Sequence, residues 1–138
     1  MSDTLVDANV LIDIFAADPL WRDWSRERLL AARATGNLVI NPIVYAEVAA
    51  MFPTQRRLDE ALGGDRFMRE DLPWEAAFSA GRAFLAYRRS GGAKRSPLPD
   101  FYIGAHADVR GYDLLTRDFA RYRQAFPALR IVAPETHP

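Results

Sequence analysis

The sequence predicts an α/β protein in which helices cover both faces of a short, mostly parallel central sheet, forming a three-layer α/β/α sandwich. Short apolar segments alternate with helical segments along the chain, a pattern typical of parallel strands buried on both faces. The chain has 138 residues, 49% of them hydrophobic and 26% charged, which is an ordinary globular composition. We therefore expect a single domain over residues 1–133, followed by a loose C-terminal tail over residues 134–138.

Strands and helices alternate in the first half of the chain. Asp18-Pro19 is expected to end the first helix, because proline interrupts a helix. Gly36-Asn37 is suited to end the second helix, and Pro42 can occupy the first position of the third. The elements expected here are a strand over 4–7, helices over 8–17 and 20–35, a strand over 38–41, and helices over 42–52 and from 53 to about 63.

The second half continues this alternation. Residues 67–72 are compatible with either a strand or a loop. Pro73 can begin a long helix, which Gly91-Gly92 is suited to end. The further elements expected are a helix over 73–90, a helix over 100–110, a strand over 112–116, a short helix or turn over 119–126 and a strand over 129–132.

The composition excludes several classes of protein. The chain has no cysteine, so it contains neither a disulfide framework nor a thiolate zinc site. Its apolar runs are short and interrupted by charged residues, which argues against a membrane-spanning segment. The first ten residues lack the basic region and cleavage site of a signal peptide. A cytoplasmic location is therefore the expectation.

The charges are unevenly distributed, although 18 basic residues balance 18 acidic ones. No acidic residue lies between Glu75 and Asp100, and this stretch contains five basic residues, Arg82, Arg88, Arg89, Lys94 and Arg95. One interpretation is a solvated helix face followed by a solvated loop. The alternative is an arm that contacts the phosphates of a polyanion, with Arg88, Arg89, Lys94 and Arg95 as candidate contacts.

Four acidic residues are candidates for a shared site. Asp7 ends the first predicted strand, Asp118 follows the strand over 112–116, Asp100 begins a helix, and Glu47 lies on the helix after the second strand. The carboxyl ends of parallel strands meet at one edge of a sheet, so all four carboxylates could converge there. Each aspartate could instead cap a helix, and Glu47 could be an ordinary surface residue.

Glu47 is the most unusual of the four. Its expected helical neighbours three and four residues away are Ile43, Val44, Ala50 and Met51, all of them apolar. An ionised carboxylate on an apolar helix face is costly unless a cation compensates its charge. This pattern favours a cation beside Glu47.

A divalent cation would remove the repulsion between converging carboxylates. A set of oxygen ligands favours Mg²⁺, with Mn²⁺ as the alternative, over Zn²⁺. Such a site is suited to hydrolysis of a phosphodiester. Asn9 lies two residues after Asp7, and Thr116 lies at the end of a predicted strand. Either side chain could orient a carboxylate or a water molecule there.

The remaining chemically notable residues have structural interpretations. His106 is expected to be a packed helix residue, and Trp21 and Trp24 to belong to the core or to a subunit interface. Asp13 is expected to act as a cap or to face solvent. The chain also lacks a phosphate-binding P-loop, a dinucleotide fingerprint and a nucleophile elbow.

Four segments together resemble the motifs of PIN-domain ribonucleases, and in particular the VapC toxins of toxin–antitoxin pairs. These segments are LVDANVLID, INPIVYAEV, SPLPDFYIGAHA and LLTRDFARYRQAFP. Their order and spacing agree with the family over nearly the whole chain. Position 8 is often serine or threonine in relatives, whereas this chain has Ala8, which removes a hydroxyl from the surroundings of the site.

The resemblance implies a PIN-like fold and assigns Asp7, Glu47, Asp100 and Asp118 to the acidic metal site, with Asn9 and Thr116 as supporting polar residues. It also implies Mg²⁺-dependent endoribonuclease activity on RNA, inhibition by a cognate antitoxin protein, and a homodimer.

Two other classes of function are compatible with the residues. The domain could be a non-catalytic protein-binding module whose aspartates only cap helices. It could also be a phosphate-accepting receiver or an aspartate-nucleophile phosphatase. The phosphatase requires an aspartate where this chain has Asn9, and the receiver requires a lysine after a late strand, where Thr116 and its neighbours stand instead.

Overall fold

The sheet has five strands, and every pair of neighbouring strands is parallel. A computed structural model describes residues 2–91 and 98–138 of the chain. The strands are β1 (Thr4–Val6), β2 (Leu38–Ile40), β3 (Phe67–Arg69), β4 (Asp113–Leu115) and β5 (Ile131–Val132), in the spatial order β3-β2-β1-β4-β5. The predicted α/β class and parallel sheet are thus confirmed, and the ambiguous segment 67–72 contributes the edge strand β3.

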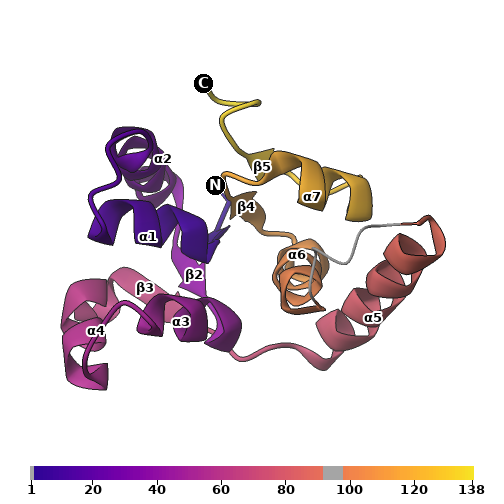
Figure 1. Cartoon of the computed structure of the whole chain (residues 1–138), viewed down its shortest axis with the longest axis horizontal. Coiled ribbons are helices and arrows are strands. Elements are labelled where there is room, and N and C mark those ends of the chain that lie inside the picture. Colours follow the sequence, from indigo (N-terminus) through magenta and orange to yellow (C-terminus); the bar gives the residue numbers. More distant parts are fainter. Residues whose placement is uncertain (1, 92–97) are drawn as a thin grey trace.

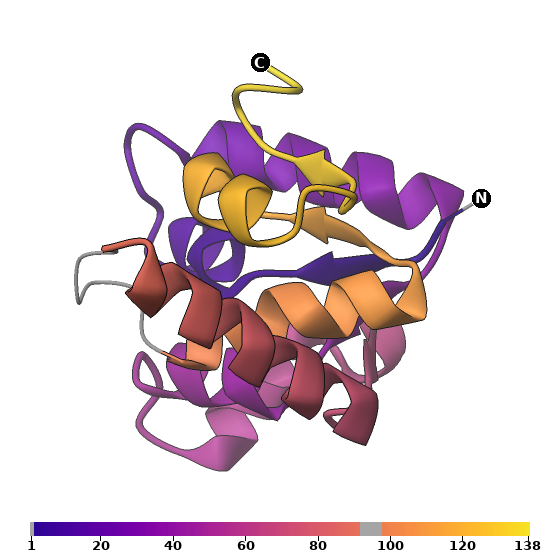
Figure 2. The same cartoon turned by 90° about the vertical axis from the view of Figure 1, so that its right-hand side faces the viewer.

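Helices cover the sheet on both sides. Helices α1 and α2 lie on one side of the strands, whereas α5, α6 and α7 lie on the other (Figures 1 and 2). The helices are α1 (Ala8–Phe15), α2 (Arg22–Thr35), α3 (Pro42–Ala49), α4 (Gln55–Leu62), α5 (Trp74–Arg89), α6 (Leu98–Arg110) and α7 (Phe119–Ala125), and a 3-10 turn, η1 (Gly64–Arg66), precedes β3.

The strands are short but almost wholly apolar, and the three central ones are buried along most of their length. Leu5, Val39 and Leu114 are each 0% exposed and lie at equivalent levels of β1, β2 and β4. A sheet buried in this way on both faces is stabilised mainly by removal of apolar surface from water.

Several helix boundaries differ from the sequence prediction by a few residues, and two of these differences matter most here. Helix α2 begins at Arg22 rather than near residue 20, because the Asp18 carboxylate accepts hydrogen bonds from the backbone of Leu20 and Trp21 at 2.8 and 2.9 Å and holds a turn there. Helix α3 ends at Ala49 rather than Phe52. This earlier end changes the surroundings of Glu47, as described below.

The register of the central strands positions the site. Val6 of β1 pairs with Leu115 of β4, and the Asp7 amide donates a hydrogen bond of 2.9 Å to the Leu115 carbonyl. Asp7 and Thr116 therefore leave the sheet side by side at its carboxyl edge, the usual place for ligand sites in parallel sheets.

The chain continues past β5 as a turn. The Thr136 hydroxyl donates to the carbonyls of Ile131 and Ala133, and the Trp24 indole donates to the His137 carbonyl. The division into a domain over 1–133 and a tail over 134–138 stays a prediction. None of the helices in the described ranges has the length and apolar character needed to cross a membrane.

Candidate functional site

Asp7 lies at the centre of a dense hydrogen-bond arrangement and is only 6% exposed. Its Oδ1 accepts a hydrogen bond of 2.8 Å from the Ala8 amide, at the N-terminus of α1. Its Oδ2 accepts from the Thr116 hydroxyl at 2.8 Å, the Tyr122 hydroxyl at 3.1 Å and the Asn9 amide at 3.3 Å. One carboxylate thus caps a helix with one oxygen and anchors the candidate site with the other.

Asn9 and Thr116 connect the ends of β1 and β4. The Asn9 side chain donates to the Thr116 hydroxyl at 3.3 Å and accepts from the Arg117 amide at 3.1 Å. The Thr116 hydroxyl also accepts from the Asp118 amide at 3.0 Å. These contacts fix the loop after β4 relative to Asp7. Both side chains lie where a supporting role requires them, although that role stays a prediction.

Asp100 and Asp118 are joined by a single arginine. Asp100 lies in the first turn of α6 and is 7% exposed. Arg121 of α7 forms ion pairs of 2.9 Å from Nη1 to Asp100 Oδ2 and 3.1 Å from Nε to Asp118 Oδ2. The guanidinium thereby links the start of α6 to the loop after β4.

Glu47 lies on α3 with an exposed side chain, close enough to the other acids to interact with them electrostatically. Partial burial of its carboxyl group, followed by the negative charges of Asp7 and Asp100, raises the pKa of Glu47 to about 7. The expectation of an apolar helix face around Glu47 holds for Ile43 and Val44, which lie on α3 and pack in or against the core, and is wrong for the other two neighbours. Ala50 and Met51 lie beyond the end of α3 and are exposed.

Asp7, Glu47 and Asp100 therefore influence one another electrostatically, and Asp118 acts on Asp100. Burial is also the main cause that raises the pKa of Asp7 and of Asp100. Hydrogen bonds from Thr116 and Tyr122 oppose the rise at Asp7, and the Arg121 charge opposes it at Asp100. Ionising all of these groups together is unfavourable unless positive charge is supplied.

The donor chemistry fits Mg²⁺ or Mn²⁺, because the convergent groups offer carboxylate oxygens, which these cations prefer. Asp7 Oδ1, which accepts a hydrogen bond from the Ala8 amide, has acceptor capacity left. Among residues 2–91 and 98–138, however, no three or more His, Cys, Asp or Glu side chains form a group ready to hold a metal ion as they stand. Asp100 and Asp118 instead form ion pairs with Arg121.

Sequence reasoning missed the role of Asp13. This carboxylate is 2% exposed, accepts from the Ser25 hydroxyl at 2.7 Å, and forms a two-point pair with Arg117 at 2.6 Å (Nε) and 2.9 Å (Nη2). The prediction of a solvent-facing or capping residue was therefore wrong. The Arg117 guanidinium also lies 5.3 Å from the centre of the Trp21 ring. The pair holds α1 against the loop that carries Thr116.

Tyr122 and Arg121 were also missed. Tyr122 is 1% exposed, and burial, followed by the charges of Asp7 and Asp100, raises the pKa of its hydroxyl well above the usual value. It therefore stays protonated and donates to Asp7. One sequence feature could have indicated both residues: they follow Asp118 by three and four positions at the start of a short helix, where side chains share a face.

His106 agrees with the prediction of a packed residue. It is 0% exposed, with Nδ1 lying 3.0 Å from Asn41 Nδ2 and Nε2 lying 2.7 Å from Glu70 Oε1. The Asn41 amide is oriented by the hydrogen bond that its oxygen accepts from the Val44 amide. Its nitrogen therefore donates to His106, whose Nε2 in turn carries the proton donated to Glu70.

The two tryptophans pack edge to face, with ring centres 6.2 Å apart, and both are half-buried. Arg82, Arg88 and Arg89 are exposed on α5. Lys94 and Arg95, the other two candidate RNA contacts, lie outside the described residues.

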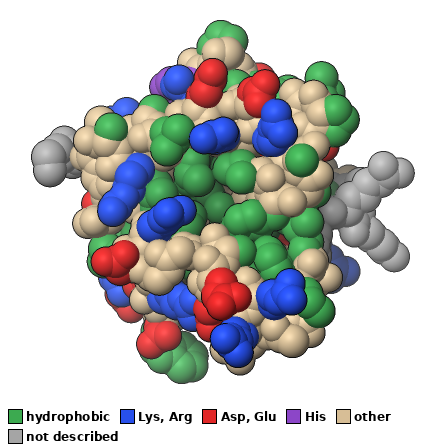
Figure 3. All heavy atoms as spheres, turned by 90° about the vertical axis from the view of Figure 1, so that its left-hand side faces the viewer, with side chains coloured by type: hydrophobic (Ala, Val, Ile, Leu, Met, Phe, Trp, Pro, Cys, Tyr) green, Lys and Arg blue, Asp and Glu red, His purple; other side chains and the backbone are tan. Residues whose placement is uncertain are grey.

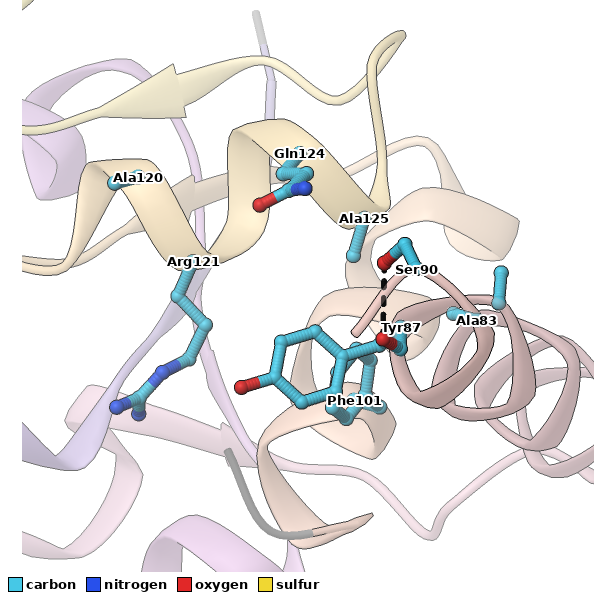
Figure 4. Close-up of a pocket in the computed structure, with 9 residues that line it drawn as sticks. Ala83, Tyr87, Ser90, Phe101, Ala120, Arg121, Gln124 and Ala125 are labelled. Atoms are coloured by element: carbon cyan, nitrogen blue, oxygen red, sulfur yellow. Dashed lines mark hydrogen bonds between the residues drawn. The ribbon is translucent and has the colours of Figure 1, made fainter. Parts of the chain in front are cut away.

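A cavity of about 380 Å³ adjoins the acidic cluster, between α5, α6 and α7. Tyr87, Ser90, Phe101 and Gln124 are among its lining residues, and Arg121 lies at its edge (Figure 4). In this view the Arg121 guanidinium extends away from Ser90 and Gln124. Arg121 thus borders both the cavity and the carboxylates.

Known proteins resemble this chain over nearly its whole length. The family model described as "PIN domain" matches residues 4–127. None of the curated proteins matches the chain. The chain is similar to a toxin–antitoxin complex from Klebsiella pneumoniae, with 25% identity and a TM-score of 0.70 over 95% of this chain and 97% of that one.

Two further solved structures share the fold. DNA-bound VapBC from Salmonella typhimurium is 23% identical, with a TM-score of 0.71 over 96% of this chain and 98% of that one. VapBC2 from Rickettsia felis, bound to a DNA fragment from its promoter, is 17% identical, with a TM-score of 0.75 over 95% and 98%.

Proposed function

The chain belongs to the PIN domain family, and from this premise we propose that it is a divalent-cation-dependent endoribonuclease of the VapC toxin type. The observation that supports the proposal most directly is the placement of Asp7, Glu47, Asp100 and Asp118. These residues come from four separate segments: Asp7, Glu47 and Asp100 influence one another electrostatically, and Asp118 acts on Asp100.

Each side chain has a distinct task in this proposal. Asp7 and Asp100 are the closest candidate ligands of Mg²⁺ or Mn²⁺, because both are buried and negatively charged once a cation is present. Glu47 and Asp118, which are more exposed, complete the acidic site or orient the attacking water. Thr116, Asn9 and Tyr122 hold the Asp7 carboxylate in one orientation by donating hydrogen bonds.

A bound divalent ion supplies positive charge at the phosphoryl oxygen and makes the attacking water more acidic. Without a divalent ion, burial and the charges of Asp7 and Asp100 raise the pKa of Glu47 to about 7, so its carboxyl group exchanges protons near neutral pH. That property suits a group that accepts a proton from water.

The test is cleavage of an RNA pool by the purified chain in Mg²⁺, in Mn²⁺ and in EDTA. Asp7→Asn and Asp100→Asn are expected to lower the cleavage rate at least about 100-fold, the upper end of what losses around metal ligands cause. Asp108→Asn is the matched control, since Asp108 is an exposed residue of the same helix as Asp100. Equal cleavage by the Asp100 and Asp108 variants would refute the assignment.

We also propose that exposed arginines of α5 hold the RNA backbone. Arg88 and Arg89 lie at the end of the helix and are exposed, and Lys94 and Arg95 are included from the sequence alone. Contacts to phosphates make binding weaken steeply as salt rises. Arg88→Gln with Arg89→Gln is expected to reduce both the affinity and the steepness of this dependence in a filter-binding titration.

A partner is proposed as well. The relatives from Salmonella typhimurium and Rickettsia felis are VapBC assemblies, and an antitoxin protein is the corresponding partner here. On the side of α1 to α4, apolar side chains gather in the middle of the surface, with charged groups around them (Figure 3). Phe15 and Phe52 belong to this side of the chain and are half-buried, and the centres of their rings lie 5.4 Å apart. An antitoxin segment bound there should inhibit cleavage and protect these segments in hydrogen exchange.

The chain is further proposed to form a homodimer. Light scattering during gel filtration should give twice the monomer mass of 15.6 kDa. A monomer at micromolar concentration would refute this part of the proposal without affecting the nuclease assignment.

The alternative function is a non-catalytic PIN-like module that only binds protein. Titration calorimetry with Mn²⁺ distinguishes the two. The nuclease predicts binding that Asp7→Asn weakens, whereas the module predicts no Mn²⁺ binding linked to Asp7.

A further inference from the structure

Arg121 bridges two carboxylates of the acidic cluster. Two of its nitrogens contact two different carboxylates, at 2.9 Å for Asp100 and 3.1 Å for Asp118. We propose that Arg121 is a resident counter-cation of the acidic cluster, which an incoming divalent ion must displace, so that the site changes from an arginine-closed to a cation-loaded form. This inference rests on the proposed nuclease function.

The charge of Arg121 acts on the whole cluster. Besides its two ion pairs, it lowers the pKa of Glu47 and opposes the rise in the pKa of Asp100 and of Tyr122. A single guanidinium therefore compensates carboxylates that come from three separate elements of the fold. In the absence of a divalent ion, this compensation stabilises the folded state of the site.

Arginine and a divalent ion would compete for the same oxygens. A cation bound through Asp7 and Asp100 would lie near the guanidinium that contacts Asp100, and like charges repel strongly when they are partly removed from water. The side chains of Arg121 and Asp100 are 31% and 10% exposed, respectively, so the two cations would not be fully screened from each other. Binding of one therefore disfavours the other.

The structure also offers Arg121 a place to move. The cavity of about 380 Å³ begins at Arg121 and extends toward Tyr87, Ser90 and Gln124 (Figure 4). Rotation of its flexible side chain toward this space would release the carboxylates while keeping the guanidinium beside them. A released guanidinium has paired donors suited to a phosphate group. Loading with a divalent ion would then favour RNA binding.

The test is the affinity for Mn²⁺ alone, measured by titration calorimetry. Arg121→Gln should bind Mn²⁺ about 10-fold more tightly than the unmodified chain, which is a typical size for coupling between competing or cooperating ligands. Arg123→Gln is the matched control. Arg123 lies on the same helix, but its guanidinium donates hydrogen bonds to the backbone carbonyls of Pro127 and Leu129 instead of to carboxylates. The control should bind Mn²⁺ within about twofold of the unmodified chain.

Two further measurements keep the inference testable. Arg121→Lys keeps the charge but cannot donate from two fixed nitrogens to two carboxylates, so its Mn²⁺ affinity should lie between those of the unmodified chain and Arg121→Gln. In EDTA, Arg121→Gln should unfold at a lower temperature than the unmodified chain, and saturating Mn²⁺ should reduce this difference.

The outcomes separate the inference from the proposed function. Equal or weaker Mn²⁺ binding by both Arg121 variants would overturn the counter-cation role and leave the nuclease assignment intact. Absence of Mn²⁺ binding by every protein would overturn both. If Arg121 had only a structural role, Arg121→Gln would lower the unfolding temperature without tightening Mn²⁺ binding.

Discussion

Replacing Arg117 by methionine should destabilise the protein strongly, because it leaves the Asp13 carboxylate buried without its ion-pair partner. Asp13 is 2% exposed, and the Arg117 side chain contacts both of its oxygens, at 2.6 and 2.9 Å. Only the Ser25 hydroxyl would remain as a polar side-chain partner among the described residues. Removing one member of a buried pair costs about 3–5 kcal/mol.

The expected shift is large enough for a simple assay. For a chain of this length, 1 kcal/mol corresponds to roughly 3 °C in the unfolding midpoint, so Arg117→Met should unfold roughly 9–15 °C lower by circular dichroism. Arg22→Met is the matched control. Arg22 pairs with Asp23 at 3.4 Å, but the two side chains are 53% and 85% exposed, and such surface pairs contribute about 0–1 kcal/mol.

A double-mutant cycle completes the test. Asp13→Asn should cost less when Arg117 is already methionine, because the uncompensated charge is then removed. A loss of less than about 1 kcal/mol for Arg117→Met, or additive losses in the cycle, would refute the reasoning that the pair is buried and coupled. Since the pair holds α1 against the loop after β4, Arg117→Met should also slow any cleavage that depends on Asp7.

Three other predictions follow from the site. Tyr122→Phe removes a hydrogen bond of 3.1 Å to Asp7 and should lower the free energy of unfolding by about 1–2 kcal/mol. The substitution should also raise the pKa of Asp7 further in an NMR titration, and an unchanged pKa would contradict this hydrogen bond. Gly104→Ala would place a methyl group 2.7 Å from Phe126 Cδ2 and 2.9 Å from Tyr122 Cδ1. This overpacking should lower the free energy of unfolding, measured by chemical denaturation, by about 1–3 kcal/mol. Gly81→Ala is the control and should be tolerated, because a methyl group added there would meet open space. The folded state raises the pKa of Glu47 from 4.5 to about 7, so without divalent ions this residue should lower the stability of the fold progressively as pH rises from 4.5 through about 7. In EDTA, the unfolding temperature should therefore fall more steeply over this pH range for the unmodified chain than for Glu47→Gln. Parallel plots of unfolding temperature against pH would argue against the pKa shift.

The meeting of Asp7 and Thr116 could be predicted from the sequence, because both residues directly follow strands of a parallel sheet. This inference needs only strand direction and neighbourhood, which hydrophobic patterns indicate well. Helix boundaries are less predictable. The apolar surroundings expected for Glu47 required a helix that continues through Met51, whereas α3 ends at Ala49.

Contacts between distant side chains could not be predicted in this way. Asp13 and Arg117 are separated by 104 positions, and no local pattern marks them as partners. The ion pairs of Arg121 depend on the rotamer of a long side chain and on how α7 packs against α6. Such features become visible only when the elements are placed in three dimensions.

The double engagement of Asp7 restricts which amino acids can stand at that position. Asparagine, serine and threonine are good helix caps but carry no negative charge. Glutamate carries the charge, but its additional methylene group would displace both oxygens from the contacts they make at 2.8 Å with Ala8 and Thr116. An alanine variant would therefore report the loss of a helix start together with the loss of a charge, and asparagine is the substitution that isolates the second effect.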